Sequence, residues 1–193
     1  MIKKKLIILA VAALLVITAT VLALSACDKD EGVSFKGTSQ KTAPIEKAVS
    51  AIYNGDGDAY YSAFPSALKE HYEESYVVAG VFAPCKNMSE YLSTYMVKVN
   101  KANYGEDYAV AVEFLSEEQI SVAELDAMHS DPNLDYYTYK RFVTEDNTEE
   151  VWRIKLKLSY SGSYGEEEKD QTVYVVKQNG KWYLHPHYVF YSF

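Results

Sequence analysis

Residues 152–158 alternate strictly between apolar and cationic side chains. The apolar positions are Trp152, Ile154, Leu156 and Leu158, and the cationic positions are Arg153, Lys155 and Lys157. Because successive side chains of a strand point to opposite faces, this period of two predicts a β-strand with one apolar and one wet face. Antiparallel sheets commonly bury one face and expose the other. The chain must therefore cover the apolar face of this strand with other elements.

Other stretches of the C-terminal half share this strand period. From residue 108 to 114 the inward set is either Tyr108, Val110, Val112 and Phe114, or the opposite set with Ala109 and Ala111. Strands are also predicted over residues 136–144 and 151–160, whereas residues 161–170 are polar and predict a hydrophilic loop. Residues 172–177 and 182–184 flank Asn179-Gly180, which predicts a hairpin with a tight turn.

The N-terminal half instead carries helical spacing. Thr42 is a predicted N-cap, Pro44 suits a first helical turn, and Asn54-Gly55 ends the helix. Its apolar stripe is Ile45, Ala48, Val49 and Ile52.

Further helices follow from further caps. We expect Asp58 to cap a helix through Phe64, and Ser66 to cap one from Ala67 to about Glu74. Ser89 is expected to cap a helix to about Lys101, with Tyr91, Leu92, Tyr95, Met96 and Val99 on one side. Ser121 and Glu124 form a capping box that opens a short helix. The apolar run over residues 76–83 fits either a helix or a buried strand.

Helices first and antiparallel strands afterwards indicate an α+β fold. Residues 48–64 (AVSAIYNGDGDAYYSAF), in which Asn-Gly-Asp separates two helices, resemble the opening of NTF2-like domains. Residues 173–184 (VYVVKQNGKWYL) resemble the closing hairpin of small NTF2-like lipoproteins of bacteria. The resemblance implies that the N-terminal helices pack on a strongly curved antiparallel sheet to form a cone. In that family the cone is a ligand pocket, an active site or a filled core. The helix predicted within residues 117–131 and the tail over residues 185–193 depart from the plain family pattern.

The first 27 residues carry the features of an export signal. Lys3, Lys4 and Lys5 precede an uncharged run from residue 6 to 26. The run ends in Leu24-Ser25-Ala26-Cys27, which resembles the lipobox of bacterial lipoproteins. The resemblance implies cleavage between Ala26 and Cys27, a diacylglyceryl group on Cys27, and a domain anchored to the cell membrane on its outer side. A single uncleaved transmembrane helix is the alternative.

These features predict three segments: a signal peptide over residues 1–26, a flexible tether over residues 27–41 and a single NTF2-like domain over residues 42–193. Without residues 1–26, the chain keeps 16 basic residues against 27 acidic ones, a formal charge of −11. Such a charge repels nucleic acid and anionic headgroups, so the lipid would be the only anchor. Cys27 and Cys85 are the two cysteines. With Cys27 lipidated, Cys85 has no disulfide partner, and we expect a small buried side chain rather than a reactive thiol.

Aromatic residues supply the candidate binding site. The chain has 18 tyrosines and two tryptophans, and a cone-forming domain would bring Tyr60, Tyr91, Tyr95 and Trp182 to a small ligand or a protein partner. The alternative is an isomerase- or hydratase-like enzyme that uses a base and an oxyanion donor in the cone. Its candidate groups are Tyr60, Tyr61, Tyr91, Tyr95, Asp107 and His71. A third reading is a structural protein that forms a homodimer through the open sheet face.

Two short segments resemble metal sites, and neither predicts a bound cofactor. His185-Pro186-His187 places two imidazoles at a spacing that can clamp zinc, but no second motif supplies a third ligand. Residues 54–58 (NGDGD) resemble the start of a calcium loop. The loop would require glycine and glutamate where this chain has Ala59 and Pro65.

Overall fold

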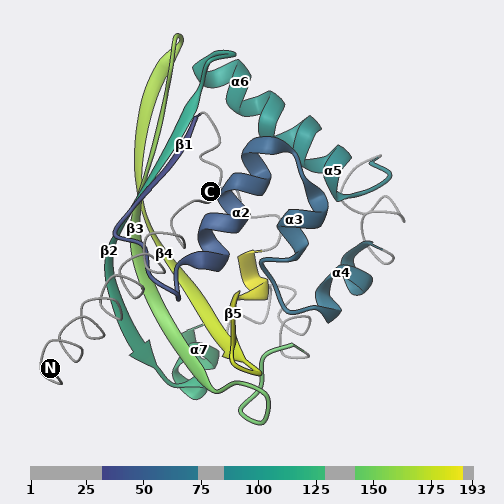
Figure 1. Cartoon of the computed structure of the whole chain (residues 1–193), viewed down its shortest axis with the longest axis vertical. Helices are drawn as coiled ribbons and strands as arrows, with labels where there is room; N and C mark the ends of the chain where they lie inside the picture. The colour runs from purple at the N-terminus through teal and green to yellow at the C-terminus, as the bar shows by residue number, and fades with distance from the viewer. Residues whose placement is uncertain (1–31, 74–84, 129–141, 189–193) are drawn as a thin grey trace, which may run out of the picture. The chain divides into compact units, whose positions relative to one another are not determined.

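A five-stranded sheet curls around the helices of the N-terminal half (Figure 1). The computed structural model describes residues 32–73, 85–128 and 142–188. The strands lie in the order β1-β2-β3-β4-β5, and the helices α2, α3 and α6 lie on the concave side (Figure 1). The predicted α+β class, with helices packed on a strongly curved sheet, is confirmed.

Four of the strands form an antiparallel meander. They are β2 (Ala109–Ile120), β3 (Glu150–Gly162), β4 (Gly165–Gln178) and β5 (Lys181–Leu184). The inward set of β2 is the one with Val110, Val112 and Phe114, all of which are buried. Leu115 occupies a bulge between Phe114 and Ser116 and is 52% exposed.

The first strand was not expected. β1 (Val33–Lys36) pairs in parallel with β2, so the sheet is mixed, and the prediction of a flexible tether through residue 41 is wrong for this segment. An edge strand of four residues is held mainly by backbone hydrogen bonds, which leave little trace in the side-chain pattern. Val33 is its one buried side chain. The described domain therefore begins at Gly32 rather than at Thr42.

The predicted loop over residues 161–170 is also wrong. β3 and β4 stay paired up to Gly162 and Gly165, and Ser161 lies opposite Glu166. Residues 165–170 are exposed on both faces, so no burial pattern reveals the strand in the sequence. At the other end of β4, the predicted Asn179-Gly180 turn is confirmed, with φ of 50° and 72° at its two residues.

Helix α2 (Ala43–Asn54) has its predicted bounds, since it starts after Thr42 and Gly55 follows it at φ 67°, and its apolar stripe is buried against the sheet. The Thr42 side chain, however, makes no capping hydrogen bond. Helix α3 (Gly57–Tyr61) is capped by Asp56 and not by Asp58, because the Asp56 side chain accepts a hydrogen bond from the Ala59 N–H. Helix α4 (Ala67–Tyr72) follows Pro65 as expected.

The fourth predicted helix is longer and less regular than expected. It comprises α5 (Met88–Tyr91), a π-helical turn η2 (Leu92–Val97) and α6 (Lys98–Tyr104), and Asn87 caps it instead of Ser89. The π-helical turn changes the residues per turn, so the expected apolar stripe does not stay on one face. Leu92 is buried, whereas Tyr95 and Val99 are 40% and 47% exposed.

A short helix covers the opposite, convex face of the sheet at one end. In α7 (Val122–Met128), the Glu124 N–H donates to the Ser121 Oγ at 3.0 Å, as the capping box predicted. Here Leu125 packs in a second apolar cluster with Ile120, Val151 and Val176. Val151 and the core residue Ile154 are three positions apart in β3, which places them on opposite faces.

Some predictions fall outside the described residues. They concern the apolar run over residues 76–83, most of the strand over residues 136–144, and Ala26 and Cys27. Within the described ranges, no helix is long and apolar enough to cross a membrane.

Candidate functional site

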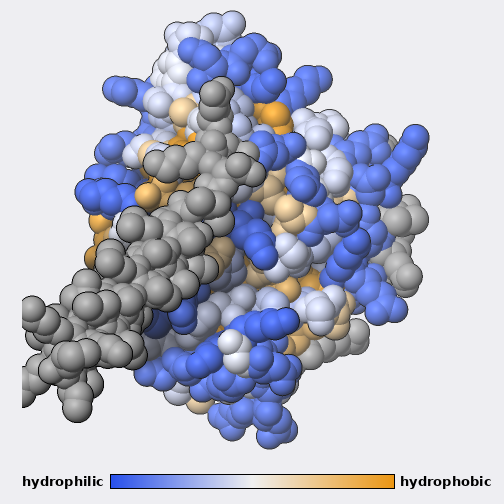
Figure 2. All heavy atoms as spheres, in the orientation of Figure 1, coloured by the Kyte–Doolittle hydropathy of each residue, from blue (hydrophilic) through white to orange (hydrophobic). Residues whose placement is uncertain are grey.

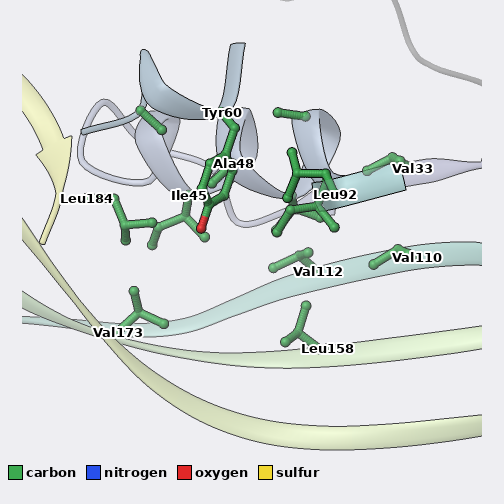
Figure 3. Close-up of a cluster of buried hydrophobic side chains, with 14 of the residues drawn as sticks. Val33, Ile45, Ala48, Tyr60, Leu92, Val110, Val112, Leu158, Val173 and Leu184 are labelled. Atoms are coloured by element: carbon green, nitrogen blue, oxygen red, sulfur yellow. The ribbon is translucent and has the colours of Figure 1, made fainter. Parts of the chain in front are cut away.

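The space between the helices and the sheet is filled by side chains of the chain itself. Figure 3 shows Tyr60 reaching from α3 toward the sheet beside Ile45, with Leu158 and Val173 on the strands below. A cavity of about 10 Å³ lies between α2, α6 and the strands β2 and β3. This volume holds about one water molecule at most. The part of the cone that the structure describes is therefore a packed core at this point.

Tyrosines make up much of this filling. The buried ones are Tyr60, Tyr61, Tyr104, Tyr108 and Tyr160. Tyr104 stacks on Tyr160 with ring centroids 5.1 Å apart. Burial raises the pKa of Tyr104 and of Tyr108 to about 12, so both phenols stay neutral at physiological pH.

The four predicted ligand-binding residues do not converge. Tyr60 is 1% exposed in the core. Tyr91 and Tyr95 lie on the helix that begins at Met88, with ring centroids 5.3 Å apart. Trp182 does not lie on a helix but on β5, which is an edge strand of the sheet.

The predicted acid and base groups are likewise dispersed. Asp107 accepts a hydrogen bond from the Ser163 N–H at 3.0 Å, which lowers the pKa of the Asp107 carboxyl and ties it to the turn between β3 and β4. His71 packs against the rings of Tyr72 and Phe142.

Tyr61 lies beside a polar pocket of about 220 Å³ that Glu73 and Ser89 also line. Burial, and then the negative charge of Glu73, raise the pKa of Tyr61, although neither the phenol nor Glu73 Oε2 makes a hydrogen bond of normal geometry. The Met88 N–H donates to Glu73 Oε1 at 3.3 Å, so Glu73 holds the N-terminus of α5. Glu73 thus connects the end of α4 with the start of α5. The raised pKa keeps the Tyr61 phenol protonated, so Tyr61 is unsuitable as a base.

The first histidine of the C-terminal pair does not face solvent. His185 is fully buried, and its N–H donates to the Tyr174 carbonyl at 3.0 Å. Its Nδ1 accepts a hydrogen bond from the His187 N–H at 3.2 Å, at the start of the short 3₁₀ helix η4 (Pro186–Tyr188). Among residues 32–73, 85–128 and 142–188, no three His, Cys, Asp or Glu side chains are grouped to hold a metal ion.

Both tryptophans instead lie in one network on the concave face, which we call the tryptophan cluster. Its members are Lys41, Glu117, Glu150, Trp152, Lys177 and Trp182. Lys41 Nζ lies 4.0 Å from the centroid of the Trp152 ring and 2.5 Å from Glu117 Oε2. On the other side, Trp152 Nε1 donates to Glu150 Oε2 at 3.0 Å.

Lys177 continues the cluster to the second tryptophan. Its Nζ is 2.8 Å from Glu150 Oε1 and 5.6 Å from the centroid of the Trp182 ring. The hydrogen bond from Lys177 lowers the pKa of Glu150, and the same bond raises the pKa of Lys177. The cluster therefore presents two half-buried indoles among paired charged side chains.

The register explains why these residues meet. Lys177 pairs with Glu150 on one side and with Trp182 on the other, and Trp152 lies one row away, opposite Gln119. Of the residues in the tryptophan cluster, only Trp182 was predicted from the sequence to bind a ligand or partner. The two tryptophans and the hairpin were visible as signals, whereas Lys41 belonged to a segment predicted to be a tether.

The convex face of the sheet has a different character. Cross-strand ion pairs join Lys36 to Glu113 and Arg153 to Glu118, and Lys157 approaches Glu168 at 3.4 Å. Charged residues are depleted at the centre of protein interfaces. Away from α7, this face therefore lacks the composition of a dimer interface.

No protein-family model matches the chain, and no curated protein matches it at a significant level.

Proposed function

We propose that this protein is a lipoprotein anchored to the outer side of the cell membrane through Cys27, and that its NTF2-like domain binds a protein partner through the tryptophan cluster. The observation that carries the binding proposal is the position of Trp152 and Trp182. Both are half-buried on the concave face and lie among the same charged side chains. The lipobox-like sequence ending in Cys27 carries the anchoring proposal.

The chemistry of the cluster suits a protein surface. Tryptophan is enriched among the residues that contribute most to binding between proteins, and such residues are surrounded by contacts that exclude water. Lys41 and Glu117 keep 23% of their side chains exposed, so a partner can reach them. An interface that covers these ion pairs would gain electrostatic specificity as well as apolar area.

The filled core argues against a small ligand between α2, α6 and the sheet, because a ligand pocket usually measures about 300 Å³ or more. The same point applies to the enzyme alternative. In addition, Tyr60, Asp107 and His71 lie in three different environments and do not surround a common point.

Mass spectrometry of the protein extracted from membranes tests the anchor. We expect an N-terminal peptide that begins at Cys27 and carries a diacylglyceryl group. Replacing Cys27 with serine should release the protein from the membrane fraction. A peptide in which Ala26 remains joined to Cys27 would overturn the lipoprotein proposal.

Photo-cross-linking in cells tests the binding surface. A benzophenone side chain at Gln119, which is exposed and lies opposite Trp152, should yield a discrete cross-linked protein. The same group at Lys155, on the convex face, is the matched control. The product should disappear in Trp182→Ala and in Lys41→Glu, provided that circular dichroism shows both variants folded. Equal products at Gln119 and Lys155 would contradict the proposed surface.

A further inference from the structure

The chain enters the described domain at one end of the sheet. The Val110 N–H donates to the Gly32 carbonyl at 2.7 Å, and Val110 pairs with Tyr160. Tyr160 is two residues from Gly162, the last residue of β3 before the turn to β4. Gly32 therefore lies near that turn, at the end of the sheet where α6 also finishes (Figure 1).

The distance from Gly32 to the proposed anchor is short. Gly32 is five positions after Cys27, and each extended residue spans about 3.5 Å, so the reach is about 18 Å at most. With the anchor at Cys27, Gly32 and the neighbouring end of the sheet must stay near the bilayer surface. The expected tether through residue 41 would have allowed almost three times that distance.

Exposed apolar side chains lie on the turn at this end and on the helix that finishes there. Tyr164, in the turn between β3 and β4, is 73% exposed, and Tyr95 and Val99 are 40% and 47% exposed. A groove of about 430 Å³ separates Tyr164 from Lys98 and Ala102 on α6. Figure 2 shows an apolar spot over α6 among hydrophilic residues. We call Tyr164 and the groove residues Lys98 and Ala102 the tether-proximal patch.

The acidic side chains near the patch are largely engaged within the protein. Glu106 lies 2.7 Å from Lys101 Nζ, and Glu167 accepts a hydrogen bond from the Tyr104 hydroxyl and lies 3.2 Å from Lys169 Nζ. Asp107 accepts the Ser163 N–H. Glu166 is exposed, as is the cationic Lys98.

Residues 28–31, between the proposed anchor and Gly32, contribute three acidic residues, Asp28, Asp30 and Glu31, and one basic residue, Lys29. A contact between this end and a bilayer would therefore depend on aromatic and apolar side chains rather than on net charge. Tyrosine is enriched at the level of lipid headgroups because its ring is apolar and its hydroxyl is polar.

We propose that the tether-proximal patch rests on the headgroup region of the bilayer to which Cys27 is anchored, and so orients the domain. This inference rests on the proposed anchor at Cys27. Trp152 is eight residues from Tyr160 along β3, about 26 Å at a typical rise for a strand. The tryptophan cluster is thereby directed away from the membrane, where a partner can reach it.

The test uses the lipidated full chain in vesicles of phosphatidylcholine and phosphatidylglycerol. Cys27 is blocked by its lipid and Cys85 is buried, so a single surface cysteine can be labelled with an environment-sensitive fluorophore. The label is placed at Ser163→Cys, beside Tyr164, or at Lys181→Cys, in β5 at the other end of the sheet. Both positions are exposed. Nitroxide lipids with the spin label near the headgroup then report proximity to the bilayer.

We expect the nitroxide lipids to quench the label at residue 163 at least about twofold more strongly than the label at residue 181, as for aromatic residues at a membrane interface. Adding Tyr164→Ser to the Ser163→Cys protein should reduce its quenching to the level seen at residue 181. Tyr164 is 73% exposed, so this variant should fold normally.

Equal quenching at residues 163 and 181, or quenching at residue 163 that Tyr164→Ser leaves unchanged, would overturn the inference. Mass analysis of the same samples separates this failure from that of the proposed function. A diacylglyceryl group on Cys27 with an unquenched label at residue 163 would contradict only the membrane contact. An unmodified Cys27 would contradict the anchor and the contact together.

Discussion

The ammonium group of Lys41 lies 4.0 Å from the centroid of the Trp152 ring and so joins the segment before α2 to strand β3. The same ammonium group pairs with Glu117 on β2. One side chain thus connects two neighbouring strands with the start of the helical layer. Its removal should affect both the stability of the domain and the surface that we propose for binding.

Lys41→Met keeps the length of the side chain but removes its charge. We expect the free energy of unfolding to fall by about 1 kcal/mol, because the half-buried Glu117 loses its cation and Trp152 loses a cation–π contact. Tryptophan fluorescence during urea unfolding measures this change. Lys36→Met is the matched control, since the Lys36–Glu113 pair is exposed and such pairs contribute about 0.5 kcal/mol. Equal effects of the two substitutions would contradict the role of Lys41.

The stability of the domain should depend on pH through Glu117. Burial acts to raise its pKa, but hydrogen bonds from Lys41 and Ser39 outweigh it and hold the pKa below the ordinary value of 4.5. Over the range between the folded and unfolded pKa values, the unfolded chain therefore binds more protons. The contribution of Glu117 is complete above the unfolded pKa, near 4.5, and is lost as pH falls through the folded pKa. Urea unfolding at a series of pH values should show a smaller acid loss in Glu117→Gln than in the unchanged chain.

Two leucines offer a test of which side of β2 and β3 is buried. Leu158 is fully buried under the helices, whereas Leu115 is 52% exposed at the bulge of β2. We expect Leu158→Ala to lower the free energy of unfolding by about 3 kcal/mol, because it removes buried methyl groups and leaves a cavity. Leu115→Ala should change it by no more than about 0.5 kcal/mol. Similar losses for both would mean that the convex face is covered at Leu115.

Two glycines test the hairpin turns in the same way. Gly180 has φ 72° and no atom within 4 Å of a would-be Cβ, so Gly180→Ala introduces backbone strain without a clash. We expect thermal unfolding to report a loss of about 1 kcal/mol. Gly165 has equally open space, but its φ lies outside the left-handed region. Gly165→Ala should be neutral or slightly stabilising, and an equal loss there would show that strain is not the cause.

Cys85 should behave as a structural side chain. It is 6% exposed, and burial, together with the nearby Glu90 carboxylate, raises the pKa of its thiol. We expect a chromogenic disulfide reagent to react slowly with the native protein at neutral pH and rapidly after addition of denaturant. Fast reaction of the native protein would contradict the buried position and would favour the reactive thiol.

The sequence predicted most of the elements that depend on local chemistry. The burial of the α2 stripe, the capping box at Ser121 and the turn at Asn179-Gly180 all agree with the structure. The errors lie where local signals are ambiguous. Asp56 and Asp58 both suit an N-cap, as do Asn87 and Ser89, and only the backbone geometry distinguishes them.

The residues of the candidate site were harder to predict from the sequence. Tyr60 and Tyr95 were both predicted to bind a ligand, yet one is a core residue and the other is exposed. The helical period does not distinguish these environments, and the π-helical turn at residues 92–97 rotated Tyr95 away from the core. Of the tryptophan cluster, only Trp182 was among the predicted binding residues.

By itself, the sequence determined the class of the fold, the alternating strands, the helix stripe and the closing turn. These follow from side-chain period and from allowed φ values, which act over a few residues. Tertiary structure decided that β1 joins the sheet, that α7 covers the other face and that tyrosines fill the core between the helices and strands. It also decided that Lys41 meets Glu117, which is 76 residues away along the chain. Such contacts depend on how distant segments share space, and no local pattern of residues encodes that choice.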